Sequence, residues 1–224
     1  MSSLIARGGY PVLLVIFIIA LICLATALII KGQIGSFLKI CSIVSFLLLF
    51  FSFYFFRDPE RKTKLDPDTI ICPADGLIID IREIFEPHYF NTPVKRVSIF
   101  MSVFNVHVNR APVDGTIDYI KYNKGKFISA FKEKASEDNE NLFIGITEKR
   151  RKQKIGVRLI AGLIARRIIF YKELNADIAQ GERINLIRFG SRVDVFCPLD
   201  TEIRVKKGDK VKAGETLLGK LSVK

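Results

Sequence analysis

Residues 184–196 read Ile184-Asn185-Leu186-Ile187-Arg188-Phe189-Gly190-Ser191-Arg192-Val193-Asp194-Val195-Phe196. Apolar residues alternate on both sides of Gly190, and this pattern predicts two β-strand segments with a break between them. A glycine inside a strand usually marks a β-bulge or a sharp corner of a sheet. The alternative is a self-cleaving bond, in which the Ser191 hydroxyl attacks the Gly190 carbonyl, followed by an N-to-O acyl shift and β-elimination.

The charge balance of the chain predicts an anionic partner. Its 224 residues include 35 Lys and Arg against 23 Asp and Glu, for a formal net charge of +12. Such an excess favours nucleic acid or acidic lipid as the partner. Basic residues interleaved with aromatic ones, typical of a nucleic-acid-binding stripe, are not evident in the sequence. We therefore expect no nucleic acid, and an acidic phospholipid bilayer instead.

Two apolar segments predict a membrane anchor. Residues 12–30 carry no charge over 19 positions, and residues 40–56 carry none over 17. At about 1.5 Å of rise per residue, both approach a hydrocarbon core about 30 Å thick. We expect a transmembrane helical hairpin within residues 1–57. The basic residues that follow it favour the cytoplasmic face of the cell (inner) membrane for the rest of the chain, residues 58–224.

The remaining sequence predicts a mainly-β domain, which makes the whole chain a membrane-anchored protein of the α+β class. Short β-rich runs alternate with Pro, Asp and Gly turns. Residues 205–219 resemble the hammerhead hairpin of lipoyl and biotinyl carrier domains, so a barrel-sandwich-like arrangement is expected. A membrane-tethered lipoyl-like adaptor or carrier without catalysis is therefore an alternative function. The strand candidates are residues 78–84, 94–106, 116–122, 142–147, 155–170, 184–189, 193–196 and 202–205.

Few side chains are available for acid–base or metal chemistry. The four cysteines are far apart without a C-x-x-C pair, so neither a disulfide framework nor a metal site is predicted. Of the two histidines, His88 lies in a predicted loop, whereas His107 ends an apolar run before a turn. Asp75 belongs to a P-x-D turn pattern that recurs at Asp114 and Asp200, so its default role is structural. The basic run at residues 148–154 fits a solvated hairpin tip or a patch for acidic headgroups.

Four ordered motifs resemble the short-form phosphatidylserine decarboxylase proenzymes. They are Phe56–Arg61 (FRDPER), Cys72–Gly76 (CPADG), Phe100–Pro112 (FMSVFNVHVNRAP) and Ile187–Val195 (IRFGSRVDV). The resemblance runs from about residue 56 to the end of the chain, and the preceding hydrophobic hairpin is also similar.

The resemblance implies a zymogen that cuts itself between Gly190 and Ser191. The products would be a β chain (1–190) and an α chain (191–224) that remain together as a heterodimer; pairing of two heterodimers is left open. Ser191 would become an N-terminal pyruvoyl group, which forms a Schiff base with membrane phosphatidylserine and drives loss of CO2 to give phosphatidylethanolamine. Such a group serves as an electron sink, so neither a metal nor pyridoxal phosphate is expected.

The resemblance also assigns roles to individual residues. Ser191 is the nucleophile, His107 is the base, and Asp75 orients or charges that histidine. The long-form enzymes have Leu-Gly-Ser-Thr and a second histidine, whereas this chain has Phe189-Gly190-Ser191-Arg192 and places Arg110 where that histidine would fall. Arg110 and Arg188 are candidates for binding the lipid phosphate, with structural ion pairs as the alternative. A decarboxylase of soluble amino acids is a third possibility, but the hydrophobic hairpin would then be superfluous.

Overall fold

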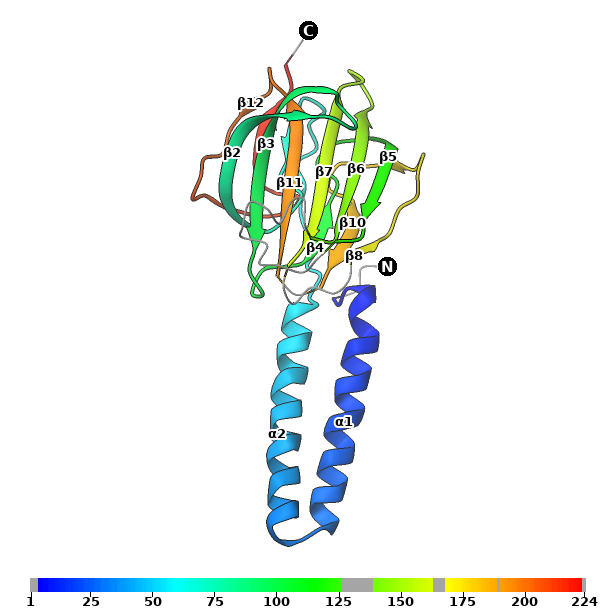
Figure 1. Ribbon diagram of the computed structural model, residues 1–224, viewed down its shortest axis with the longest axis vertical. Helices are drawn as coiled ribbons and strands as arrows, with labels where there is room; N and C mark the ends of the chain where they lie inside the picture. Colours follow the sequence, from blue (N-terminus) through cyan, green and yellow to red (C-terminus); the bar gives the residue numbers. More distant parts are fainter. Residues whose placement is uncertain (1–3, 126–138, 163–167, 189, 223–224) are drawn as a thin grey trace. The chain divides into compact units, whose positions relative to one another are not determined.

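The protein has two compact units, an N-terminal helical hairpin and a β domain (Figure 1). The structure is a computed structural model that describes residues 4–125, 139–162, 168–188 and 190–222. The units comprise Met1–Pro59 and Glu60–Lys224. The first contains the 3-10 helix η1 (Arg7–Gly9) and the helices α1 (Tyr10–Ile29) and α2 (Gly32–Phe55).

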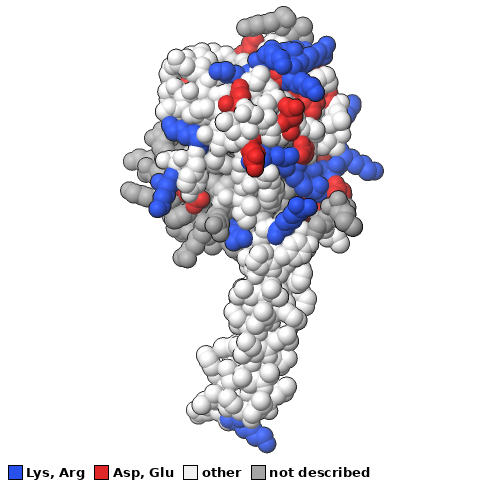
Figure 2. All heavy atoms as spheres, turned by 90° about the vertical axis from the view of Figure 1, so that its right-hand side faces the viewer, with Lys and Arg blue, Asp and Glu red and all other residues white. Residues whose placement is uncertain are grey.

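Helices α1 and α2 pack closely against each other through small residues. Ala20 and Ser42 are buried, and the Ser42 hydroxyl donates a hydrogen bond of 3.3 Å to the Ala20 carbonyl. Most of the large apolar side chains point outward, as Leu28 does with 73% of its surface exposed. Both helices are long and apolar enough to cross a membrane, with mean hydropathy of 3.3 and 2.2. Figure 2 shows this uncharged surface, with basic side chains at one end of the hairpin.

The hairpin turn is shorter than the sequence predicted. Helix α2 begins at Gly32 and includes Lys39, whereas the apolar run predicted a helix from residue 40. Lys39 limits the uncharged run but does not limit the helix. Lysine has good helix propensity, and its long side chain can reach water. Only Ile30 and Lys31 therefore connect the two helices.

The β domain contains one large antiparallel sheet and two small ones. The large sheet has the strand order β13-β2-β3-β11-β7-β6-β5-β9, and Figure 1 shows that it is curled. The small sheets have the orders β4-β10-β8 and β1-β14-β12. This arrangement confirms a mainly-β domain. The strands are β1 (Thr69–Ile71), β2 (Gly76–Glu86), β3 (Thr92–Met101), β4 (Val108–Arg110), β5 (Gly115–Asn123), β6 (Asn141–Glu148), β7 (Lys154–Ala161), β8 (Ile168–Phe170), β9 (Asp177–Ile178), β10 (Arg183–Ile187), β11 (Ser191–Pro198), β12 (Glu202–Ile203), β13 (Lys210–Val211) and β14 (Leu217–Lys220).

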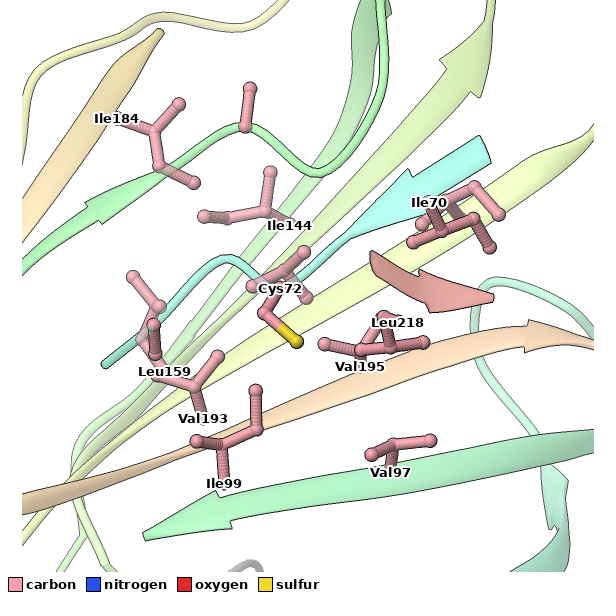
Figure 3. Close-up of a cluster of buried hydrophobic side chains, with 14 of the residues drawn as sticks. Ile70, Cys72, Val97, Ile99, Ile144, Leu159, Ile184, Val193, Val195 and Leu218 are labelled. Atoms are coloured by element: carbon pink, nitrogen blue, oxygen red, sulfur yellow. The ribbon is translucent and has the colours of Figure 1, made fainter. Parts of the chain in front are cut away.

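Apolar residues from all three sheets share one core. Every second residue of a strand points to the same face, so Val193 and Val195 of β11 point inward together. They belong to one buried cluster with Ile70, Cys72 and other residues of the small sheets and the segments beside them (Figure 3). Full burial of each such side chain contributes about 1.5–3 kcal/mol. This core fixes the position of β11, whose first residue is Ser191.

The strand predicted over residues 94–106 is interrupted by a turn. Strand β3 ends at Met101, and β4 begins at Val108 in a different sheet. The side-chain oxygen of Asn105 accepts hydrogen bonds from the Ser102 backbone N–H (2.9 Å) and hydroxyl (2.8 Å), and the Asn105 N–H donates to the Ser102 carbonyl. Asparagine and serine close turns in this way whatever the apolar pattern around them. The turn carries the chain from the large sheet to a small one.

Two other predicted segments also have different bounds in the structure. The run over 155–170 contains β7 and β8, with residues 163–167 outside the described part, and β10 ends at Ile187 while Phe189 is not described. The basic run at 148–154 is the β6–β7 hairpin turn, in which the Glu148 carboxylate accepts the N–H groups of Arg150 and Arg151. The structure therefore confirms the prediction that this basic run forms the tip of a hairpin.

Candidate active site

The chain passes from the small sheet to the large sheet at the Gly190–Ser191 bond. Ile187 ends β10, and Ser191 begins β11. Gly190 has a φ angle of +61°, in the left-handed region that residues with a Cβ rarely adopt. A Cβ added at Gly190 would meet nothing within 4 Å, so the backbone angle rather than lack of space favours glycine. The break predicted from the sequence is therefore confirmed as a bend between two sheets.

The carbonyl of Gly190 is held by a backbone donor. Its oxygen accepts a hydrogen bond of 3.0 Å from the N–H of Gly162. Gly162 directly follows β7, and the pairing of Ala161 with Ser191 brings it to this place. A fixed N–H aimed at a carbonyl oxygen stabilises the negative charge that develops there when a nucleophile attacks. No pattern in the sequence indicated Gly162, because its position depends on the pairing of distant strands.

Ser191, which follows the Gly190–Ser191 peptide bond, is fully buried. It lies opposite Met101 of β3 and Ala161 of β7, and its hydroxyl donates a hydrogen bond of 3.3 Å to the Met101 sulfur. A thioether is a weak acceptor, so little is lost when the hydroxyl turns to another partner. The Ser191 hydroxyl therefore lies in a water-poor environment with only a weak acceptor.

His107 lies on a segment that runs beside the bend. The segments 101–107 and 187–191 are joined at both ends, since Met101 pairs with Ser191 and the Ile187 N–H donates to the His107 carbonyl at 3.2 Å. The His107 ring is buried, and its Nδ1 lies 3.0 Å from the carbonyl oxygen of Asn105. A carbonyl can only accept, so this contact assigns the proton to Nδ1 and leaves Nε2 as the basic nitrogen of the neutral ring. His88, in contrast, is exposed in a loop.

Asp75 lies on a turn bonded to the strand that follows His107. Its carboxylate accepts hydrogen bonds from Arg61 at 2.9 and 3.2 Å and from the Ala213 N–H at 2.8 Å. The turn is joined to β4 by a 2.8 Å bond from the Arg110 N–H to the Pro73 carbonyl. Among the hydrogen bonds of the described residues, none joins Asp75 to His107. Arg61 had not been assigned a role from the sequence.

The two candidate arginines differ in their surroundings. Arg110 is buried, and its guanidinium donates to the Gly181 carbonyl at 2.8 Å. A Cβ added at Gly214 would lie 2.8 Å from its Cδ, so the side chain is tightly packed. Arg188 is partly exposed and lies two residues before Gly190. Arg188 is therefore the more accessible of the two.

The buried thiols of the β domain are poor nucleophiles. Burial raises the pKa of Cys72 far above the usual range and that of Cys197 to about 11. Both stay protonated at neutral pH, and a thiol reacts as its thiolate. Within the described parts of the chain, no three or more His, Cys, Asp or Glu residues form a group that could hold a metal ion.

Comparisons with known proteins point to one family. The family described as phosphatidylserine decarboxylase matches residues 48–219. The "Phosphatidylserine decarboxylase proenzyme" of Desulfotalea psychrophila is 50% identical over 184 residues, covering 81% of this chain and 86% of its own. That of Magnetococcus marinus is 42% identical over 223 residues, covering 100% and 98%. That of Syntrophus aciditrophicus is 44% identical over 218 residues, covering 97% and 98%. These matches cover most of the chain, and they show that it belongs to the phosphatidylserine decarboxylase family.

Proposed function

We propose that this protein is a phosphatidylserine decarboxylase made as a proenzyme, which cuts itself between Gly190 and Ser191. One observation carries the proposal: Gly190 is held in a left-handed conformation, with its carbonyl bonded to the Gly162 N–H, directly before a buried serine. Curated proenzymes of this name match the chain over nearly its whole length.

In the first step of cleavage, the chain's own groups carry out an acyl shift. Nε2 of His107 takes the proton of the Ser191 hydroxyl, and Oγ attacks the Gly190 carbonyl carbon. The oxygen that becomes negative is the one bonded to the Gly162 N–H. When this intermediate collapses, the bond from carbon to nitrogen breaks, the amine takes a proton, and an ester links Gly190 to Ser191.

The second step breaks the chain and converts the serine. Loss of the Cα proton of Ser191 expels the Gly190 carboxylate from Cβ and leaves a dehydroalanine at the new N-terminus. Water then replaces the nitrogen, ammonia leaves, and a pyruvoyl group remains. The products are a β chain of residues 1–190 and an α chain of residues 191–224, 34 residues by count. Because β11 pairs with β3 and β7, the two chains remain joined as a heterodimer.

The residues around Ser191 fit a pyruvoyl group and its substrate. Such a group supplies an electron sink for loss of CO2 from an α-amino acid, as pyridoxal phosphate does in other enzymes. Burial of Ser191 keeps water from that position, and His107, whose backbone is bonded to Ile187 at the end of β10, returns a proton to the substrate Cα in this proposal. Arg188 binds the lipid phosphate in this proposal, and the buried Arg110 is the second candidate for that role. Asp75 and Arg61 act indirectly, by fixing the turn bonded to β4 and so the position of His107.

The helical hairpin supports a lipid substrate. Phosphatidylserine has two acyl chains, so the enzyme must reach its headgroup at a bilayer, and two apolar helices with a basic protein suit that place. We assign the protein to the cell inner membrane, with the β domain on the cytoplasmic face. A decarboxylase of soluble amino acids leaves these helices without a purpose. A non-catalytic lipoyl-like adaptor leaves the Gly190 geometry and the decarboxylase relatives unexplained.

Mass spectrometry of the purified protein tests the cleavage. We expect two polypeptides, the smaller beginning with a pyruvoyl group at position 191 and ending at Lys224. Ser191→Ala should give one intact, inactive chain. Ser222→Ala, which removes another serine hydroxyl from the same short segment, should be cut and active. An unbroken native chain in membranes that convert phosphatidylserine through it contradicts the proposal.

A histidine substitution tests the proposed base. His107→Gln should accumulate uncut chain, and any material that is cut should decarboxylate at least about 100-fold more slowly, as expected on loss of a general acid–base group. The matched change His88→Gln affects an exposed loop residue and should alter neither rate. Cleavage and turnover at normal rates in His107→Gln would remove His107 from the mechanism.

A further inference from the structure

A polar pocket lies on the side of β11 that faces away from the Ser191 side chain. Successive residues of a strand point to opposite faces, so Arg192 points away from the side that holds Ser191. The pocket has a volume of about 280 Å³. It is formed by β2, β3, β11 and the turn before β13, and its polar side chains are Asp80, Arg82, Arg96, Ser98, Arg192 and Lys207.

Positive charge exceeds negative charge in this pocket. Asp80 accepts hydrogen bonds from Arg82 at 2.6 Å and Arg96 at 3.0 Å. Arg192 is paired with Asp194 at 2.7 and 2.8 Å. Counting Lys207, four cationic side chains face two carboxylates, an excess of two positive charges.

The basic groups crowd one another on this face of the sheet. Arg158 of β7 lies opposite Asp194 of β11. Burial lowers the pKa of Arg158, and the positive charges of Arg96 and Arg192 add to this effect, against the opposing attraction of Asp194 and Glu86. A bound anion would relieve this repulsion.

Several donors that line the pocket have no acceptor among the described residues. The Ser98 hydroxyl and the Arg96 Nε are both buried, with residue exposures of 1% and 7%, and neither atom has a hydrogen-bond partner within the described ranges. The Lys207 ammonium is exposed and forms no ion pair with the described residues. Buried polar groups in proteins nearly always have partners, so the pocket lacks acceptors that an anion could supply.

We propose that this pocket binds a phosphate group. A tetrahedral anion presents several oxygens at once, and it would accept from Ser98, Arg96 and Lys207 together. The volume suits a phosphate with a small organic group attached and is too small for two acyl chains. The phosphate could be free in solution or belong to a lipid headgroup at the bilayer. The site is separate from Ser191 and His107 and adds a second anion site to the proposed function.

Isothermal titration calorimetry tests the site on the whole protein in a non-ionic detergent and a phosphate-free buffer. The probes are inorganic phosphate and dihexanoyl phosphatidic acid below its critical micelle concentration. Lys207→Gln should weaken binding about tenfold, and Ser98→Ala several-fold, the usual cost of a lost hydrogen bond to a charged group. Lys206→Gln makes the same charge change at the adjacent exposed residue outside the pocket and should weaken binding less than twofold.

The two probes distinguish the sources of the phosphate. Equal affinity for both indicates free phosphate, whereas tighter binding of the lipid indicates a headgroup. The proposal is overturned if neither probe binds, if Lys207→Gln and Ser98→Ala bind like the native protein, or if Lys206→Gln weakens binding as much as Lys207→Gln. The same titration in Ser191→Ala needs neither cleavage nor decarboxylation, so its result is independent of the proposed reaction.

Discussion

The two faces of β11 are both buried but differ in chemistry. On the inner face, Ser191, Val193 and Val195 lie against the common core. On the outer face, Arg192 and Asp194 form an ion pair whose side chains are 3% and 0% exposed. Alternation of apolar and polar residues usually separates core from solvent, but here it separates an apolar interior from a buried charged layer. One strand thereby places Ser191 and the Arg192–Asp194 ion pair on opposite faces of the sheet.

The largest effect on stability is expected from the outer face. Asp194→Leu leaves Arg192 buried without its carboxylate and should lower the free energy of unfolding by about 3–5 kcal/mol. The double variant Arg192→Met/Asp194→Leu should recover most of this loss, because the arginine hydrogen-bonded to Asp194 is removed together with it. Urea denaturation followed by circular dichroism, in the uncut Ser191→Ala background, measures both. A double variant as unstable as the single one would show that packing, and not charge, governs this face.

A smaller loss is expected from the inner face. Val195 is fully buried in the core, and Val195→Ala removes two carbon atoms and leaves a cavity. The free energy of unfolding should fall by about 2 kcal/mol. The same denaturation assay applies, with Val15, which is 56% exposed and lies outside the β domain, as the control site for Val→Ala. A loss equal to that of Asp194→Leu would erase the expected difference between the faces.

The bend that begins β11 should tolerate substitution at a modest cost. Gly190→Ala meets no steric clash but must adopt a φ of +61°, which costs about 1–2 kcal/mol for a residue with a Cβ. We expect this loss of stability together with slower cleavage, because relaxation of the bend would move the carbonyl away from the Gly162 N–H. Gel analysis over time measures the cleavage rate. A lower stability with an unchanged cleavage rate would show that the conformation of Gly190 is not needed for cleavage.

The smallest effect concerns acid stability on the outer face. Burial alone would raise the pKa of Asp80, but hydrogen bonds from Arg82 and Arg96 outweigh it and hold the pKa below its usual value. The carboxylate therefore adds stability above its unfolded pKa of about 3.9, and this stability is lost as the pH falls through the lower folded value. Its partly exposed position limits the contribution to below about 1 kcal/mol. Melting temperatures of native and Asp80→Asn protein should differ at pH 7 and converge at the lowest pH; a constant difference contradicts this.

Much of the fold was predictable because it depends on local patterns. Long uncharged runs indicated the two helices, and alternation around Gly190 indicated two strand segments with a bend. The turn at Ser102–Asn105 was missed because side-chain hydrogen bonds close it within an apolar run. The start of α2 was also missed, since Lys39 ended the apolar run but did not end the helix.

The candidate site was predictable only in part. The Gly-Ser pair inside a strand pattern singled out Ser191, and His107 is one of only two histidines, but their proposed roles came from the family resemblance. Backbone pairs join their segments at Met101–Ser191 and His107–Ile187. Gly162 could not be identified, since its N–H reaches Gly190 only through the pairing of β7 with β11. The partners of Asp75 likewise come from residues 61 and 213, far from it in sequence. The catalytic roles of these residues remain predictions.

The pairing of β11 on both sides has a consequence for refolding. The strand is hydrogen-bonded to β3 from Ser191 to Pro198 and to β7 from Ser191 to Phe196. In the precursor this strand is tethered, so refolding is unimolecular and independent of protein concentration. If the proposed cleavage cuts the chain after residue 190, a denatured sample must reunite two separate polypeptides, and recovery becomes second order and slows on dilution. The enzyme would then assemble easily only once, before it becomes active.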